Sequence, residues 1–145
     1  MALEAPTVGE VTLLQYLVNM AAPTNLVLHL YNNDPTISAS TVIGNISEVP
    51  SGIGYAPITL VGTAWTTTTP AALGTAVYSE VTFSFTTAQS VYGYYVTSTN
   101  ASTLLWLEKF SGAPFTLPAG GGTISISPRV SINWSFVYYF KKKKP

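Results

Sequence analysis

The sequence contains no cysteine, which excludes disulfides, thiolate metal ligands and a cysteine nucleophile. Charge is also scarce, because Asp, Glu, Lys and Arg make up 8% of the 145 residues, against about 25% in a typical soluble domain. Thr, Ser and Asn must therefore solvate most of the surface, and a surface with so little charge favours association. Stability has to come from packing within the chain or against neighbours.

Long hydrophobic runs are missing as well, although 47% of the residues are hydrophobic. The longest candidate, residues 134–140, is much shorter than the run of about eighteen apolar residues that a membrane-spanning helix needs. The first ten residues, MALEAPTVGE, lack the basic and apolar regions of a secretory signal. We expect one domain, no membrane partner and no secretory leader.

The net charge of zero hides an uneven distribution of charge. Four of the six basic residues form the run 141–144, so the rest of the chain, with six acids and two bases, has a net charge of −4. One basic run without a wider basic patch does not favour nucleic acid as a partner. The lysines either keep the preceding aromatic run soluble or dock on an acidic protein surface.

One segment near the start has a helical period. Apolar residues recur there at spacings of three and four, at Val11, Leu14, Leu17 and Val18. This pattern predicts a short helix over about residues 10–20, which ends before Pro23. Val11, Thr12 and Tyr16 would also suit a strand, but the leucine-rich strip favours a helix.

The rest of the chain has the pattern of β-strands. Residues 26–31 alternate in polarity and end at the turn sequence NNDP, after which we expect a polar loop from about 34 to 47. Further strands are predicted over residues 55–61 and 64–68. In residues 81–85, apolar and polar side chains alternate cleanly, as in a sheet with one solvated face.

The second half contains a predicted hairpin and a final strand. Residues 91–97 and 104–110 flank the turn sequence STNAS and should pair antiparallel. Gly93 indicates a bulge or a close approach by another backbone. The apolar alternation of residues 124–132 stays in phase across Pro128, which indicates an edge strand or a bulge there.

About eight short strands with turns between them predict a mainly β fold. We expect an antiparallel β-sandwich, jelly-roll-like, with one short N-terminal helix, and a closed barrel is the alternative. Residues 1–133 should form this single domain. Residues 134–145 should form a separate aromatic, lysine-rich C-terminal arm.

The sequence predicts neither a catalytic site nor a metal or cofactor site. His29 lies on a predicted strand without a cysteine or an acid at ligand spacing, so we interpret it as a strand residue on a polar or half-buried face. Glu80 and Glu108, both on predicted strands, are the best candidates for a carboxylate pair. The simpler interpretation has one at a strand end and the other paired with Lys109 or Arg129. We therefore expect a protein that is not an enzyme.

Several segments together resemble a known family. The order GYAPITLVGTAW, EVTFSF, VYGYYVT, LLWLEKF and GAPF, within residues 9–133, is similar to small tailed-bacteriophage virion proteins encoded among head and tail structural genes. The resemblance implies a noncatalytic virion component, a capsid decoration (cement) protein that binds across capsid subunits and stabilises the shell. The alternative is a tail or fibre accessory module that binds another virion protein, or a host glycan through aromatics such as Trp65, Tyr92 or Trp106.

This interpretation sets expectations for partners and location. The partner would be the major capsid protein or another virion structural protein. The protein would be located on the capsid surface of a virion that is assembled in the host cytoplasm. A homo-oligomer is expected, with a trimer as one candidate. The predicted partner-binding residues lie in the C-terminal arm: Trp134, Phe136, Tyr138, Tyr139, Phe140, Lys141, Lys142, Lys143 and Lys144.

Overall fold

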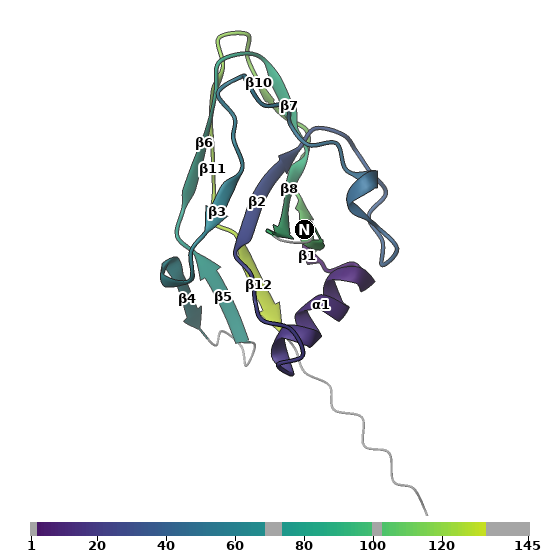
Figure 1. Ribbon diagram of the computed structural model, residues 1–145. Helices are drawn as coiled ribbons and strands as arrows, with labels where there is room; N and C mark the ends of the chain where they lie inside the picture. The colour runs from purple at the N-terminus through teal and green to yellow at the C-terminus, as the bar shows by residue number, and fades with distance from the viewer. Residues whose placement is uncertain (1–2, 69–73, 100–102, 133–145) are drawn as a thin grey trace, which may run out of the picture.

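The computed structural model describes residues 3–68, 74–99 and 103–132 (Figure 1). Over these ranges the chain is mainly β, with antiparallel strand pairs, one α-helix and two short 3-10 helices, η1 (Ile43–Asn45) and η2 (Gly62–Ala64). The predicted β-rich antiparallel fold with one helix near the N-terminus is confirmed at this level.

The helix α1 spans Thr7–Leu17, so it begins and ends about three residues earlier than predicted. It begins after Pro6, whose carbonyl oxygen accepts hydrogen bonds from the N–H groups of Gly9 and Glu10 at 2.8 and 3.0 Å. Pro6 is the N-cap residue and has the extended backbone (φ −61°, ψ 155°) that is usual at this position. The helix ends because Asn19 adopts a left-handed conformation (φ 60°) and the Met20 N–H bonds back to the Gln15 carbonyl at 2.9 Å, a Schellman-type cap.

The largest sheet has five strands in the order β1-β9-β8-β2-β3. All six residues of its central strand, β8, are buried, because both faces of the sheet are covered. The predicted pairing of residues 91–97 with 104–110 is confirmed by the β8–β9 ladder. The bounds are β1 (Leu3–Glu4), β2 (Leu26–Tyr31), β3 (Ile58–Leu60), β8 (Gly93–Ser98) and β9 (Leu104–Lys109).

Between Gly74 and Ile132 the chain forms a long two-stranded antiparallel ribbon. Strands β8 and β9 are the part of this ribbon that belongs to the five-stranded sheet. Moving outward along it, β7 pairs with β10, β6 with β11 and β5 with β12. In Figure 1 this ribbon rises beside the five-stranded sheet and bends over its top. The bounds are β5 (Gly74–Tyr78), β6 (Val81–Phe85), β7 (Gln89–Val91), β10 (Phe115–Leu117), β11 (Gly122–Ile126) and β12 (Arg129–Ile132), with β4 (Trp65–Thr68) paired to β5.

The close approach at Gly93 and the irregularity of the β8–β9 ladder lie at different positions. The close approach predicted at Gly93 is confirmed, since a side chain there would collide with the Glu108 carbonyl oxygen and the Tyr31 ring. The ladder irregularity lies farther along, between Val96 and Thr97, where β9 contributes Leu105 as an extra residue.

The predicted final strand is divided at Pro128. Its two parts, β11 and β12, pair with different strands, and the Pro128 carbonyl accepts the Tyr78 N–H at 2.8 Å between them. β12 lies at the edge of a three-stranded sheet, as the proline predicted. Strand β5 was not predicted, and Glu80, predicted on a strand, lies in the turn between β5 and β6.

The core has two parts, one on each face of the five-stranded sheet. The larger part includes Leu28, Leu30, Val96, Phe83 and Phe85, and the smaller consists of Tyr31, Tyr95, Leu104 and Leu107. Burying a side chain of this size contributes about 1.5–3 kcal/mol to folding. The second, smaller cluster is covered by Ile37 and Ile46, which belong to the loop after β2.

Candidate binding surface

The loop over the second face of the sheet, residues 32–49, is here called the strap. Its two ends are joined by backbone hydrogen bonds from Asn32 N to Ser47 O (2.9 Å) and from Val49 N to Leu30 O (3.0 Å). The Asn33 amide adds two more, because its Nδ2 donates to the Asn45 carbonyl and its Oδ1 accepts the Ser47 N–H, both at 2.9 Å. The predicted polar loop is therefore closed and held at its base.

A polar network anchors the end of the strap to β2. Glu48 Oε1 lies 2.8 Å from His29 Nδ1 and accepts a hydrogen bond from the Tyr55 hydroxyl at 2.9 Å. The Tyr55 oxygen in turn accepts the buried Leu30 N–H at 3.0 Å. The opposite ring nitrogen of His29 contacts Thr97 Oγ1 at 3.0 Å, and the imidazole stacks on Tyr95 with centroids 4.6 Å apart.

The half-buried position predicted for His29 is confirmed. Its acidic partner, Glu48, was not predicted from the sequence. Glu48 is 19 residues away in sequence, so no local spacing could have indicated it. In the described ranges no group of three or more His, Asp or Glu side chains could hold a metal ion. Through its contacts with Glu48 and Thr97, His29 joins the end of the strap to the five-stranded sheet.

Four tyrosines in and near this network are strongly protected from ionisation. Burial is the main cause that raises the pKa of Tyr31, Tyr55, Tyr94 and Tyr95. Nearby carboxylates raise the pKa further, Glu48 for Tyr55 and Tyr95, and Glu108 for Tyr94. Each hydroxyl therefore stays protonated well above the ordinary tyrosine range.

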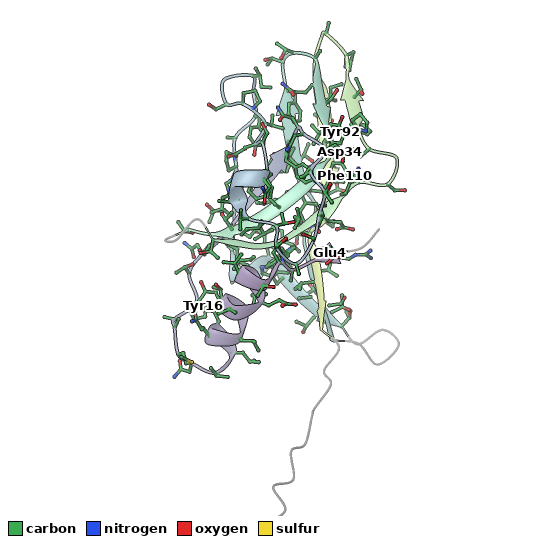
Figure 2. The ribbon with its side chains drawn as sticks, turned by 90° about the vertical axis from the view of Figure 1, so that its right-hand side faces the viewer. Glu4, Tyr16, Asp34, Tyr92 and Phe110 are labelled. Atoms are coloured by element: carbon green, nitrogen blue, oxygen red, sulfur yellow. The ribbon has the colours of Figure 1, made fainter. Side chains whose placement is uncertain are left out.

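The structure does not join the two candidate carboxylates. Glu80 is exposed in the β5–β6 turn, whereas Glu108 is buried on β9 and accepts the Tyr94 hydroxyl at 2.6 Å. Glu108 forms an ion pair with neither Lys109 nor Arg129, and Lys109 pairs with Asp34 instead. The Lys109 ammonium also lies 5.9 Å from the centre of the Tyr92 ring. Figure 2 shows Asp34 and Tyr92 close to each other.

The aromatics considered for glycan stacking do not form an open platform. Trp106 is buried, with its indole Nε1 lacking a hydrogen-bond partner in the described structure. Trp65 is half-buried and packs edge-on against Tyr78, and Tyr92 is half-buried beside Lys109. This arrangement gives the glycan alternative no direct support.

The most unusual surface is the outer side of α1. Gly9 faces β9 so closely that a side chain there would collide with the carbonyl oxygens of Leu104 and Leu105. Because Gly9 is buried against the sheet, the opposite side of the helix points outward. The apolar residues that are thereby left 41–76% exposed are Val8, Val11, Leu14, Leu17, Val18 and, just after the helix, Met20.

The strap extends this apolar surface. The Thr7 N–H donates to the Ala39 carbonyl at 2.9 Å, which joins the start of α1 to the strap. The strap's Val42 and Ile43 are also exposed, at 48 and 40%. Figures 1 and 2 both place α1 and the strap, with its short blue coil, on the same side of the molecule. We call the six residues on α1 and after it, together with Val42 and Ile43, the α1–strap face.

Charge is nearly absent from the α1–strap face. Glu10 is the one charged residue of α1, while the strap's Asp34 and Glu48 are paired with Lys109 and His29. Interface cores are likewise depleted of charged residues. Amphipathic surface helices normally turn their apolar side toward the core and their polar side toward solvent, so an apolar side that stays exposed has the character of a contact surface.

The predicted and observed candidate sites do not overlap. Every predicted partner-binding residue, from Trp134 to Lys144, lies outside the described residues. In the sequence, the apolar strip of α1 predicts a helix but not which side of it is exposed. A signal for its exposure was present, because Gly9, Thr12 and Tyr16 line the opposite side, where a small residue allows close packing.

No family model, curated protein or solved structure matches this chain. Within the described residues, no helix has the length and apolar character required to cross a bilayer.

Proposed function

We propose that this protein is a noncatalytic structural component of a virion, a capsid decoration protein that binds across capsid subunits. The observation that carries the proposal is the α1–strap face, an apolar and almost uncharged surface on a well-packed β domain. Exposed apolar patches of this kind mark protein–protein contacts. The family resemblance of the β segments supports the choice of a virion as the assembly.

The proposed mechanism is adhesion. Each α1–strap side chain is about half exposed, so covering it contributes roughly 1 kcal/mol, half the value for full burial. The eight side chains together contribute on the order of 8 kcal/mol, whereas association costs about 4–15 kcal/mol. The gain lies within the range of the cost, so the face alone gives weak binding at most, and a second contact by residues 134–145 would strengthen the attachment.

A protein that binds only the assembled shell stabilises that shell by mass action. Decorated particles should therefore release their contents at a higher temperature than undecorated particles. A particle whose release temperature is unchanged by saturating amounts of the protein would contradict the cement role.

The decisive experiment is gold-labelled antibody imaging of intact phage particles, with antibody raised against this chain. Label spread evenly over the heads is the expected result. Label at one vertex or on the tail would instead support the tail or fibre accessory module. Particles without label would refute the virion proposal.

A further inference from the structure

We propose that the outer edge of β7 is a docking site for an extended peptide segment of a partner protein, which adds to β7 as a further strand. This inference deepens the proposed function and rests on it for the identity of the partner, a shell subunit. The docking itself can be tested without a virion. It concerns a part of the molecule that is distinct from the α1–strap face.

Strand β7 has a pairing partner on one side only. It pairs antiparallel with β10 in a sheet of two strands, so its other edge has no partner strand in the described part of the chain. A free edge presents a row of N–H and C=O groups to which a further strand can bond.

The path of β2 explains why this edge is free. Strand β2 lies beside β8 as far as Tyr31, which is opposite Gly93, and the Tyr31 carbonyl accepts the Tyr92 N–H at 2.9 Å. The chain then turns into the strap, where the Asn32 N–H bonds to the Ser47 carbonyl at 2.9 Å. Figure 1 shows β7 and β10 at the top of the molecule, beyond the end of β2. Strand β2 therefore ends before it reaches β7.

A depression of about 320 Å³ lies where β2 leaves the sheet. It is lined by Asn32, Ala88, Gln89, Ser90, Thr116 and Leu117. The side chains of Asn32, Gln89, Ser90 and Thr116 make no hydrogen bond to another described residue, whereas the adjacent Asn33 amide uses both of its ends in the strap. Four polar side chains beside the edge of β7 are therefore available to a ligand.

The lining favours a neutral ligand group that both donates and accepts hydrogen bonds. Amide and hydroxyl side chains do both, and no lining residue is charged. The peptide groups of a main chain have the same chemistry, and a strand that adds to a sheet edge is held mainly by main-chain hydrogen bonds.

A saccharide also carries neutral donors and acceptors. Ligand pockets are, however, lined mainly by hydrophobic and aromatic side chains, and none of the six residues around this depression is aromatic. The free edge beside the depression matches a peptide strand and not a sugar ring. The observations therefore favour an extended peptide.

The length of the edge limits the strength of the contact. Strand β7 has three residues, which corresponds to about 10 Å of strand. Such an edge holds a peptide through only a few main-chain hydrogen bonds, so this contact alone is weak. On an assembled shell it would act together with the α1–strap face, and two linked contacts bind far more tightly than either one.

Peptide selection tests the docking directly. The bait is the immobilised full chain, and the probe is a ribosome-displayed library of random peptides of about ten residues. The retained peptides should bind a double variant, Asn32→Ala with Gln89→Ala, at least about fivefold more weakly, the loss expected for one or two net hydrogen bonds. Asn25→Ala is the matched control, because this exposed amide lies before β2, and it should leave the Kd unchanged.

Methylation of the peptide main chain tests strand addition itself. Successive N–H groups of a strand point to opposite sides, so only every second N–H of the added peptide faces β7. N-methylation of alternate residues should weaken binding at least about tenfold in one phase and have little effect in the other. Equal effects in both phases would show that the peptide is not bound as a strand and would refute the inference.

Nuclear magnetic resonance locates the bound peptide. The amide signals of Gln89, Ser90 and Val91 should shift on binding. Shifts confined to the α1–strap face, or a library that yields no retained peptide, would refute docking at β7. A saccharide from a glycan array whose binding depends on Gln89 would identify a host glycan as the occupant and would also refute it.

Particles separate this inference from the proposed function. Labelled heads that carry the double variant and the unmodified protein at equal occupancy would refute docking of a shell subunit at β7 and leave the decoration role intact. Peptides that dock at β7 of a protein that labels no particle would support this inference and refute the virion role.

Discussion

Gly9 and Gly93 set the distance between neighbouring parts of this fold. At each, a side chain would collide with backbone atoms, the carbonyls of Leu104 and Leu105 for Gly9 and the carbonyl of Glu108 for Gly93. Backbone within a paired strand cannot move aside without breaking its ladder. Gly9 also determines which side of α1 faces solvent, so this one residue controls the orientation of the proposed contact face.

We expect Gly9→Ala to lower the free energy of unfolding by about 1–3 kcal/mol, the usual cost of overpacking. Alanine favours a helix by up to about 1 kcal/mol, but this gain cannot offset a collision with fixed carbonyls. Urea unfolding measures the difference. The control is Gly62→Ala, because no atom lies within 4 Å of the added Cβ there. Equal stability of Gly9→Ala and the unmodified protein would contradict the close packing of α1 on β9.

At the scale of elements, the strap is held by polar contacts as well as by packing. It packs Ile37 and Ile46 on the smaller core cluster, but its return to β2 depends on Glu48, His29 and Tyr55. The same segment carries Val42 and Ile43 of the α1–strap face. Loosening the network should therefore disturb the contact face before the main core.

Tyr55→Phe should destabilise the protein by about 1–3 kcal/mol, because the buried Leu30 N–H loses its acceptor. Hydrogen exchange should accelerate at the Val49 amide, which bonds to the Leu30 carbonyl. Tyr16→Phe is the control, since the Tyr16 hydroxyl has only a 3.5 Å contact with Thr24. Unchanged exchange at Val49 would show that the network does not hold the strap.

At the scale of the whole molecule, the buried tyrosines make stability dependent on pH. In the unfolded chain they ionise near pH 10, whereas Tyr31, Tyr55, Tyr94 and Tyr95 have raised pKa values in the native state. Above pH 10 the unfolded state therefore binds fewer protons than the native state, and stability falls as pH rises.

Each such tyrosine lowers the free energy of unfolding by about 1.4 kcal/mol per pH unit in this window. Four together should remove about 5–6 kcal/mol between about pH 9 and about pH 11, as measured by urea unfolding. Tyr55→Phe should reduce this pH-dependent loss by about a quarter. A free energy of unfolding that stays constant to pH 11 would contradict the burial of these hydroxyls.

The arm of residues 134–145 is a separate part of the whole-molecule hypothesis. Its deletion should weaken incorporation into particles while leaving the isolated domain folded. Quantitative immunoblotting of purified particles measures incorporation. A variant with Lys141–Lys144 changed to Ser keeps the aromatic residues of the arm and removes its charge. Comparing this variant with the deletion separates the two contributions to incorporation. Undiminished occupancy after deletion would refute a role for the arm.

The local sequence was enough to predict much of the fold. Period-three and period-four spacing predicted α1, strict alternation predicted β6, and Gly93 and Pro128 marked positions where the ribbon deviates. These signals work because each reflects sterics or burial within a few residues. The same reasoning missed β5, whose sequence GTAVY is short and follows the turn-like run TTTTPAAL.

Only the tertiary structure decided which of these residues meet and which surface stays open. Glu48 reaches His29 because the strap returns along β2, and Tyr94 reaches Glu108 across the β8–β9 ladder. The sequence by itself determined that α1 is a helix and that the chain is poor in charge and free of cysteine. The close packing of Gly9 on β9 turned the apolar side of α1 outward. Helical periodicity defines such a side, but only contact with another element decides whether it is buried.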